Sequence, residues 1–355
     1  MRTPFRSSAG LARRAFRRAA LASLRLPPSV LRAFAGRART SGDGLTLDLQ
    51  TQAMLRCLEL AHVRHFQDVG VQAARRSMDL LSPVLDFAPR REVRWHDRYV
   101  PGPGGDLPMR VYEPEGVQQP APLLVYLHGG GFVLGSLVSH HGLCSYLAER
   151  GRCLVAHVEY RLAPEHPFPA AFDDVLAAFR WVAAHGAELG CDPSRIAMGG
   201  DSAGANLTAA AALVLRDEQV RPALQLLIYP AVDLTRSFES HERFAEGFYM
   251  TRAMIDWFLD NYLTRPEQKR DPRASPWFAE DVRGVPPALI LTAGFDALRD
   301  EGKAWAGRLS EAGVHVEHRC VEGCIHGFAS MAGGIDAARE GIEWAGRRLA
   351  ESLAK

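Results

Sequence analysis

Long apolar runs and closely spaced cysteines are both missing from this 355-residue sequence. No stretch approaches the roughly 18–20 consecutive apolar residues that a membrane-spanning helix needs. The six cysteines are scattered without a C-x-x-C pair and are too sparse for a disulfide-stapled secreted scaffold. We therefore expect a chain without a membrane span, located in a reducing compartment, the cytoplasm.

Lysine is nearly absent, with only Lys269, Lys303 and Lys355 in the chain. Arginine supplies most of the 42 basic groups, which 41 acidic groups almost cancel, so the formal charge is +1. A body this close to neutral lacks the electrostatic footprint of a protein that binds nucleic acid. Hydrophobic residues at 47% and charged residues at 23% are typical of a globular protein and exclude collagen-like and wholly disordered classes.

Acidic residues are missing from the first 42 positions, which contain ten arginines and no lysine. The remaining 313 residues hold 32 basic and 41 acidic groups, so the two parts carry opposite net charges of +10 and −9. We expect residues 1–42 to form a loosely attached Arg-rich extension whose side chains face water. Twin-arginine export, an organelle transit peptide and a surface helix in weak contact with a membrane remain open as alternatives.

Beyond the extension, the pattern predicts a short helical unit followed by a long α/β unit. Apolar residues recur at near-helical spacing over residues 43–90, and β-rich segments around the turn 101–105 predict a hairpin at a sheet edge. Apolar strands then alternate with helices, which predicts parallel crossovers and a sheet covered on both faces. The expected strands are 123–127, 154–158, 196–199, 224–229, 288–293 and 314–320, and the expected helices are 141–151, 170–185, 203–214, 250–262 and 335–353.

The sequence GDSAG at residues 200–204 lies between an apolar strand and an Ala-rich helix. A G-x-S-x-G in this setting is typical of a nucleophile elbow, a strained strand-to-helix turn that exposes the hydroxyl of Ser202. A second glycine-rich turn, HGGGF at residues 128–132, also follows an apolar strand. Its bare backbone N–H groups, together with that of Ala203, are suited to bind the oxyanion of a tetrahedral intermediate.

A serine nucleophile needs a base and an orienting acid, which hydrolases of this kind place in the chain order Ser, Asp or Glu, His. Asp296 and His326 each follow a predicted strand, where α/β sheets assemble their sites. Asp300 is a competing acid, although the first turn of a helix explains its position equally well. Cys320 and Cys324 near His326 suggest a zinc site, but a fourth ligand with suitable spacing is missing, so we expect no metal and no cofactor.

Five motifs in this order resemble the hormone-sensitive lipase family of α/β-hydrolase esterases: HGGGF, YRLAPEHPFPAA at 160–171, GDSAG, D-x-L-R-D-E-G at 296–302 and HGF at 326–328. The resemblance covers about residues 92–330 and implies an α/β-hydrolase fold with a mostly parallel central sheet and a helical cap. It implies Ser202, Asp296 and His326 as catalytic residues and Gly130, Gly131 and Ala203 as the oxyanion hole. Two positions depart from the family pattern, Ala297 in place of the usual Pro and His141 in place of a frequent Asp.

The family's cap maps onto residues 43–90 and a second segment at about 235–286, inserted into a catalytic domain that spans 91–355. Under this cap, Phe132, Phe248 and Tyr249 are the candidate substrate-binding residues. Within YRLAPEHPFPAA we expect Arg161 and Glu165 to form a buried structural pair. The sequence leaves the oligomeric state open, a homodimer included.

These roles predict a serine carboxylic ester hydrolase that forms an acyl-enzyme on small-molecule esters with short to medium acyl chains. An amidase or deacetylase and an interfacial lipase use the same triad and remain alternatives. A non-catalytic receptor of the same fold is a further alternative, which the presence of His326 argues against.

Overall fold

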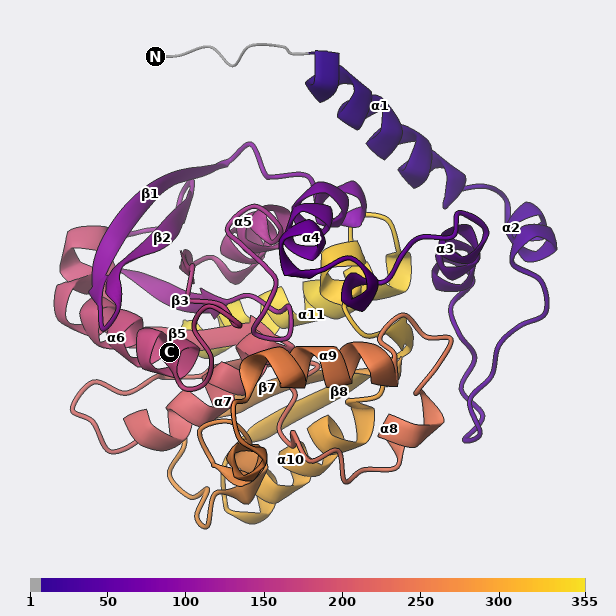
Figure 1. Ribbon diagram of the computed structural model, residues 1–355. Coiled ribbons are helices and arrows are strands. Elements are labelled where there is room, and N and C mark those ends of the chain that lie inside the picture. Colours follow the sequence, from indigo (N-terminus) through magenta and orange to yellow (C-terminus); the bar gives the residue numbers. More distant parts are fainter. Residues whose placement is uncertain (1–7, 355) are drawn as a thin grey trace.

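An eight-stranded, mostly parallel sheet runs through the computed structural model, which describes residues 8–354 (Figure 1). The strands are β1 (Val93–Gly102), β2 (Gly105–Pro114), β3 (Ala121–Leu127), β4 (Leu154–Val158), β5 (Cys191–Asp201), β6 (Gln225–Ile228), β7 (Ala288–Phe295) and β8 (Val316–Ile325). Their order across the sheet is β1-β2-β4-β3-β5-β6-β7-β8. Only the pairs β1/β2 and β2/β4 are antiparallel, so the predicted α/β class is confirmed.

The antiparallel edge forms because Pro103 and Gly104 close a tight hairpin between Gly102 and Gly105. Strand β1 is exposed at several positions, whereas β3 and β7 are buried along their whole length. Fully buried strands are the rule for the parallel part of a sheet with helices on both faces. The sequence shows this as continuous apolar runs in the central strands and an alternating pattern in the hairpin.

Helices cover the two faces of the sheet according to the alternation of side chains along each strand. The helices of the α/β unit are α5 (His141–Gly151), α6 (Ala170–His185), α7 (Ala203–Leu215), α10 (Arg299–Glu311) and α11 (Asp336–Leu353), with short 3₁₀ turns η2 (Gly186–Leu189) and η5 (Phe328–Met331). In β7, Leu289 and Leu291 pack in the cluster that includes residues of α5 and α11, and Ile290 packs with Trp305 of α10.

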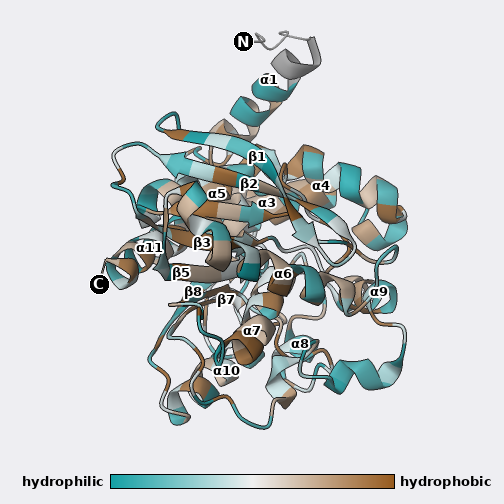
Figure 2. Cartoon of the chain, turned by 90° about the vertical axis from the view of Figure 1, so that its left-hand side faces the viewer, coloured by the Kyte–Doolittle hydropathy of each residue, from teal (hydrophilic) through white to brown (hydrophobic). Residues whose placement is uncertain are grey.

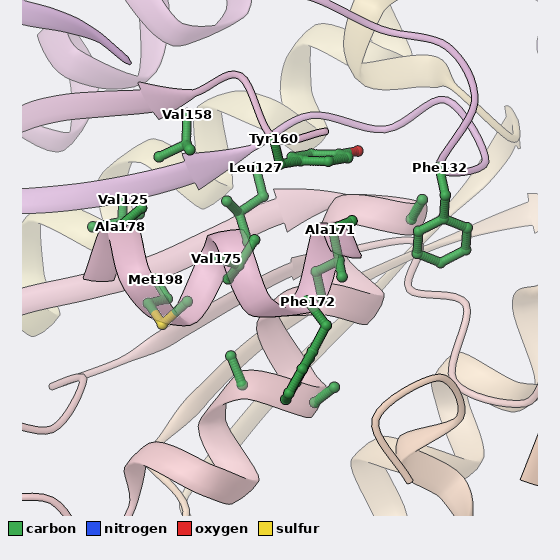
Figure 3. Packing of buried hydrophobic residues seen from close by; sticks show 14 of the residues in the cluster. Val125, Leu127, Phe132, Val158, Tyr160, Ala171, Phe172, Val175, Ala178 and Met198 are labelled. Carbon is green, nitrogen blue, oxygen red and sulfur yellow. The ribbon is translucent and has the colours of Figure 1, made fainter. Parts of the chain in front are cut away.

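Helix α6 shows how the core is built on the face that it covers (Figure 3). Its residues Phe172 and Val175 belong to one buried cluster with Leu127 of β3, Val158 of β4 and Met198 of β5. Helix α6 therefore packs against the part of the sheet in which β3 leads into the glycine-rich turn and β5 leads into Ser202.

Two helical regions lie outside this layered core, at the carboxyl ends of the parallel strands (Figure 1). The N-terminal region contains α1 (Ser8–Ser23), α2 (Pro28–Ala35), α3 (Leu49–Leu60), η1 (Phe66–Asp68) and α4 (Val71–Leu85). The insertion between β6 and β7 contains α8 (Ser240–Arg243), α9 (Arg252–Tyr262), η3 (Pro266–Arg270) and η4 (Pro276–Phe278). No helix in residues 8–354 is both long and apolar enough to cross a bilayer.

The expectation that residues 1–42 are only loosely attached is wrong for the part described. Leu24 and Leu31 are buried in the same cluster as Met54 of α3. Arg17 donates hydrogen bonds to the carbonyl oxygens of Pro83 and Asp86 at 3.0 and 2.7 Å. The sequence did not show this packing because the two buried leucines are separated by a proline turn and form no periodic stripe.

The expected pair of Arg161 and Glu165 does not form either. Arg161 binds the buried carboxylate of Asp174 at 2.7 Å, and Glu165 binds Arg75 of α4 at 2.6 Å. The segment between Arg161 and Glu165 is a turn, so a spacing of four residues does not place their side chains on one face as it does in a helix. Glu165 instead links the α/β unit to the N-terminal region.

Candidate active site

Ser202 lies between the end of β5 and the first residue of α7, as the elbow pattern predicts. Its backbone φ of 55° is in a region that side-chain-bearing residues rarely adopt. A side chain at Gly200 or Gly204 would collide with the backbone of Leu127 in the neighbouring strand β3. The two glycines therefore allow the turn to pass close to β3 and hold the Ser202 hydroxyl at the carboxyl end of the sheet.

The side chains of Ser202, His326 and Asp296 form a continuous chain of hydrogen-bond distances. Nε2 of His326 is 2.9 Å from Oγ of Ser202, and Nδ1 of His326 is 2.9 Å from Oδ2 of Asp296. Asp296 is 1% exposed and His326 is 7% exposed. This arrangement can remove the serine proton through His326 while the carboxylate fixes the orientation of the imidazole.

Asp300, the competing acid, is engaged elsewhere. Its carboxylate accepts hydrogen bonds from Nε of Arg299 at 2.9 Å and from the backbone N–H of Ser240 at 3.0 Å. Asp300 lies in the first turn of α10, the position that a dipole role would give it.

Both ring nitrogens of His326 face Asp296 and Ser202, so neither is free to bind a zinc ion together with Cys320 and Cys324. Over residues 8–354, no group of three or more His, Cys, Asp or Glu side chains is arranged to hold a metal ion.

The glycine-rich turn after β3 lies beside Ser202. Gly130 and Gly131 have φ of 125° and 60°, and a side chain at Gly131 would enter the ring of Phe258. No group in residues 8–354 accepts a hydrogen bond from the N–H of Gly130, Gly131 or Ala203. These three N–H groups are thus available to a ligand next to the serine.

Asp201, which precedes the serine, supports the glycine-rich turn from below. Its Oδ1 accepts hydrogen bonds from the N–H of Gly129 at 2.9 Å and the hydroxyl of Tyr126 at 2.8 Å, and lies 3.2 Å from Nε2 of His140. Burial raises the pKa of Asp201, but the charge of His140 and these hydrogen bonds outweigh burial and hold the pKa at about 2. Burial likewise lowers the pKa of His140, and the carboxylate more than reverses this and raises it.

Two further histidines beneath the turn stay neutral. Burial, with the charge of His140 as a smaller cause, lowers the pKa of His128 to about 3, and burial also lowers the pKa of His157 well below its usual value. The hydroxyl of Tyr160 donates to the carbonyl oxygen of His128 at 2.6 Å. The glycine-rich turn therefore packs against buried polar side chains, among which His140 and Asp201 form an ion pair.

Two cavities meet at Ser202, and both are also lined by Gly131, Met250 and Phe258. The small cavity, about 50 Å³, extends from the serine toward the insertion. The large cavity, about 220 Å³, extends between the two helical regions. Its walls include Met54 and Leu58 of α3, Met78, Leu81 and Leu85 of α4, and Met254 and Phe258 of α9.

The three candidate substrate-binding residues separate in the structure. Phe132 lines the small cavity and stacks on Tyr262 with ring centroids 3.8 Å apart. Tyr249 lines the large cavity. Phe248 lines neither cavity, and its ring packs instead against Phe244 and Phe295 at the margin of a core cluster.

A family model described as the alpha/beta hydrolase fold matches residues 124–330, more than half of the chain. The chain belongs to the α/β-hydrolase family. The resemblance to hormone-sensitive-lipase-like esterases and the fold that it implied are thereby confirmed.

Two relatives of this hydrolase are named as ester hydrolases. It is 41% identical over 297 residues to the carboxylic ester hydrolase LipN of Mycobacterium tuberculosis, covering 81% of this chain and 78% of LipN. It is 40% identical over 244 residues to the ethyl acetate hydrolase of Pseudomonas putida, covering 67% and 76% of the two chains.

Two of the solved structures that match are ester hydrolases as well. An ester hydrolase from the metagenome of Lake Arreo, complexed with a derivative of bipyridine phosphonate, superposes with a TM-score of 0.84 at 37% identity and covers 87% of this chain and 100% of its own. A hyperthermophilic esterase from Pyrobaculum calidifontis superposes with a TM-score of 0.78 at 37% identity, covering 84% and 97%.

Sequence reasoning missed the residues that surround the chemical groups. His140 and Asp201 form the ion pair under the glycine-rich turn, and His241 lines the small cavity. An isolated histidine carries no signal of its partner, because the partner comes from a distant part of the chain. Asp201, within GDSAG, was the one local sign of this ion pair, since a charged residue at the end of a buried strand needs a partner.

Proposed function

We propose that this chain is a serine carboxylic ester hydrolase, with Ser202, His326 and Asp296 as its catalytic residues. The hydrogen-bonded chain from Asp296 through His326 to Ser202, which opens on two cavities, carries the proposal. The ester-hydrolase relatives support the same activity.

The reaction begins when Nε2 of His326 takes the proton of Ser202 and the serine oxygen attacks the ester carbonyl. The N–H groups of Gly130, Gly131 and Ala203 stabilise the negative charge that develops on the carbonyl oxygen. His326 then protonates the departing alcohol, and the acyl group stays on Ser202. Water, deprotonated by the same histidine, attacks the acyl-enzyme, and His326 returns this proton to Oγ of Ser202 as the acid is released. Asp296 stabilises the imidazolium in both halves.

The cavities support short to medium acyl chains. Residues 43–90 and about 235–286 supply the helices that wall the large cavity, and we propose that together they act as a cap over the active site. Each methylene gains about 0.8 kcal/mol only while apolar space remains to bury it. A chain longer than the cavity has to displace packed side chains of α4 or α9, which opposes binding.

A hydrolysis screen tests this function. The purified chain is assayed on p-nitrophenyl esters from C2 to C16 and on a p-nitroanilide of matched acyl length. We expect turnover of the short and medium esters and far slower release of the anilide. Faster anilide turnover would make the chain an amidase, a jump in rate on emulsified long-chain substrate would make it an interfacial lipase, and no turnover of any substrate would remove the esterase assignment.

The N-terminal helices offer a second contact, and we propose that they bind an anionic membrane surface. Exposed arginines with no carboxylate partner in residues 8–354 gather on this region: Arg13, Arg14, Arg18, Arg25, Arg32 and Arg37. Phe16, Leu26, Val30 and Phe34 expose between 42% and 58% of their area beside them. Figure 2 shows α1 projecting away from the sheet with hydrophilic and hydrophobic residues along it.

Arginine mixed with exposed apolar side chains is the composition that peripheral helices use on anionic bilayers. The body carries the opposite charge, so this region is the part of the chain that such a surface attracts. Val63 and Leu81, which line the large cavity, are exposed on the neighbouring elements. Docking through α1 and α2 would therefore bring the cavity close to esters dissolved in the bilayer.

Vesicle sedimentation tests the membrane contact. The full chain should bind vesicles of phosphatidylglycerol and phosphatidylcholine at low salt and should not bind pure phosphatidylcholine. The triple change Arg13→Gln, Arg14→Gln and Arg18→Gln should weaken binding by about 3 kcal/mol, roughly a hundredfold.

A matched control changes three exposed arginines of the body, Arg94→Gln, Arg221→Gln and Arg265→Gln, and should bind nearly as well as the unaltered chain. Equal binding to neutral vesicles, or equal losses in the two triple variants, would contradict the proposal. A dimer that forms without vesicles and dissociates in the first variant would assign the surface to a second copy of the chain.

We propose a cytoplasmic location. All six cysteines carry free thiols, which fits a reducing compartment. The cytoplasmic leaflet also carries the negative surface potential that the N-terminal arginines would meet.

A further inference from the structure

The wall of the small cavity next to Ser202 includes a buried histidine, His241, that has no role in the proposed ester hydrolysis. His241 of α8 lines this cavity together with Ser202 and Gly131. Most of the remaining wall is apolar and includes Leu234, Ile255, Leu259 and Leu298. A polar ring in the wall of a mostly apolar cavity needs a hydrogen-bond partner or a reason to lack one.

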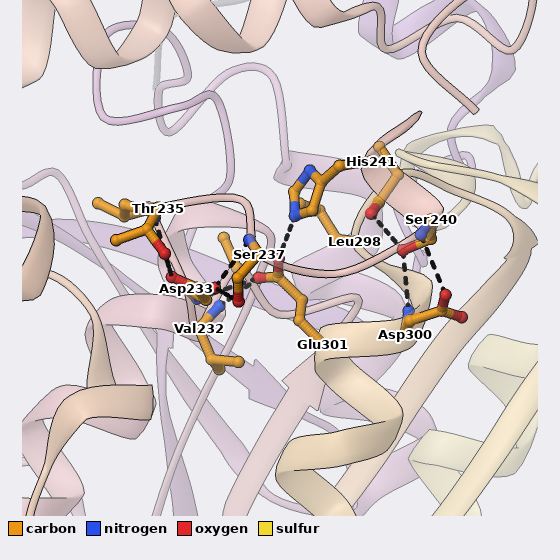
Figure 4. Close-up of polar contacts among 12 residues, drawn as sticks. Val232, Asp233, Thr235, Ser237, Ser240, His241, Leu298, Asp300 and Glu301 are labelled. Atoms are coloured by element: carbon orange, nitrogen blue, oxygen red, sulfur yellow. Dashed lines mark hydrogen bonds and ion pairs between the residues drawn. The ribbon is translucent and has the colours of Figure 1, made fainter. Parts of the chain in front are cut away.

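His241 is held rigidly by its neighbours (Figure 4). Its Nε2 lies 2.6 Å from Oε2 of Glu301, a carboxylate that is fully buried. The other oxygen of Glu301 accepts the backbone N–H of Val232 at 2.5 Å. The hydroxyl of the preceding residue, Ser240, donates to the carbonyl oxygen of Ala297 at 2.7 Å, which ties α8 to the turn before α10.

The other ring nitrogen, Nδ1, is buried and has no hydrogen-bond partner in residues 8–354. In Figure 4 the ring directs one nitrogen toward Glu301 and the other away from it. Two other polar side chains line the small cavity, Asp233 and Arg236, and each faces a partner of its own. Asp233 accepts hydrogen bonds from Thr235 and Ser237, and the guanidinium of Arg236 lies 2.6 Å from the carboxylate of Asp256.

On the basis of the proposed esterase function, we propose that His241 recognises a hydroxyl group on a short acyl chain seated in the small cavity. A hydroxyl suits Nδ1 in either protonation state of the ring, since it can donate to a bare nitrogen and accept from an N–H. The volume of about 50 Å³ restricts this position to a short chain. The preferred substrates are therefore esters of short hydroxy acids, whose acyl chain occupies the small cavity, whereas the longer unsubstituted acyl chains considered above occupy the large cavity.

The experiment compares ethyl butyrate with ethyl 2-hydroxybutyrate and ethyl 3-hydroxybutyrate, by titrating the released acid at constant pH. The unaltered enzyme should hydrolyse at least one hydroxy ester with a kcat/KM equal to or above that of ethyl butyrate. His241→Leu should lower the ratio of hydroxy ester to butyrate by about three- to tenfold, the size of one buried hydrogen bond. The loss should fall on the hydroxy ester alone.

Two further variants separate recognition from folding. The double change His241→Leu and Glu301→Gln removes the carboxylate that the single change leaves unpaired, and it should lower the ratio by the same factor. His315→Leu alters an exposed histidine at the opposite end of the sheet and should leave the ratio unchanged.

The outcomes are distinct for the two proposals. If the enzyme hydrolyses ethyl butyrate but its preference does not respond to either His241 variant, the hydroxyl proposal is wrong and the esterase function stands. If the unaltered enzyme hydrolyses both hydroxy esters with a lower kcat/KM than ethyl butyrate, the hydroxyl proposal also fails. If no ester is hydrolysed, both proposals fall together.

Discussion

Replacing Asp201 with Asn removes the negative charge beneath the glycine-rich turn while keeping a side chain of the same shape. In the unaltered protein this carboxylate accepts a hydrogen bond from the N–H of Gly129 and lies beside His140. An amide keeps one acceptor oxygen for Gly129 but offers no charge to the histidine. The change should therefore mainly lower the free energy of unfolding. It should also lower kcat, because the glycine-rich turn loses part of its support.

The pKa of Asp201 sets the size of the effect on stability. A carboxyl held at a pKa of about 2 in the folded chain, against 3.8 ordinarily, corresponds to about 2 kcal/mol of folding free energy. Because the folded pKa is depressed, this contribution is complete above about pH 4 and is lost as the pH falls through 2. Asp201→Asn should lower the free energy of unfolding by about 2 kcal/mol at pH 6.

The contribution of this ion pair to folding stability also falls at high pH, because His140 loses its proton. Its folded pKa is raised, so its share of stability is present below its ordinary value of 6.5 and is lost as the pH rises through the folded pKa. The difference between the unaltered chain and Asp201→Asn should therefore be largest between about pH 4 and 6.5 and should shrink at higher pH.

Urea unfolding at pH 4.5, 6 and 9 checks this prediction, with His140→Asn and the double variant completing a thermodynamic cycle. The two single changes should be strongly non-additive, because each removes one half of the same ion pair. Equal stability of Asp201→Asn and the unaltered chain at pH 6, or a difference that grows toward pH 9, would refute the reasoning.

Three other predictions concern turnover. Asp296→Asn should lower kcat by about 10⁴-fold, whereas Asp300→Asn should stay within a few-fold, and a reversed order would make Asp300 the acid of the triad. The kcat/KM for p-nitrophenyl esters should rise to about C4–C8 and then fall, with Phe258→Ala moving the optimum to longer chains, and a profile still rising at C16 would contradict the cavity argument. Gly131→Ala should lower kcat because the new methyl group meets the ring of Phe258, and unchanged kcat in the folded variant would remove Gly131 from the oxyanion hole.

The elements that carry chemistry could be predicted because their signals are local. Ser202 and the glycines around it occupy one short turn, and Asp296 and His326 each directly follow a strand. Parallel strands bring their carboxyl ends to one edge of the sheet, so residues far apart in the chain meet there.

The contacts that the sequence did not predict depend on tertiary packing. Leu24 and Leu31 bury themselves against α3 although an arginine-rich composition suggests a solvated tail. Arg161 pairs with Asp174 and not with Glu165, which is nearer in the sequence. The reason is that the chain turns between Arg161 and Glu165. Phe248 joins the core while its neighbour Tyr249 lines the large cavity, a difference that depends on the backbone of one turn.

The most direct test of the central claim is to identify the residue that becomes covalently modified. The chain is incubated with a p-nitrophenyl phosphonate, digested, and mapped by mass spectrometry while residual esterase activity is measured. We expect one adduct per chain, on Ser202, with activity lost in proportion. A folded Ser202→Ala variant should take no adduct and should have a kcat lower by about 10⁴–10⁶-fold. An adduct on another residue, or a folded Ser202→Ala variant that retains more than about one per cent of the activity, would contradict it.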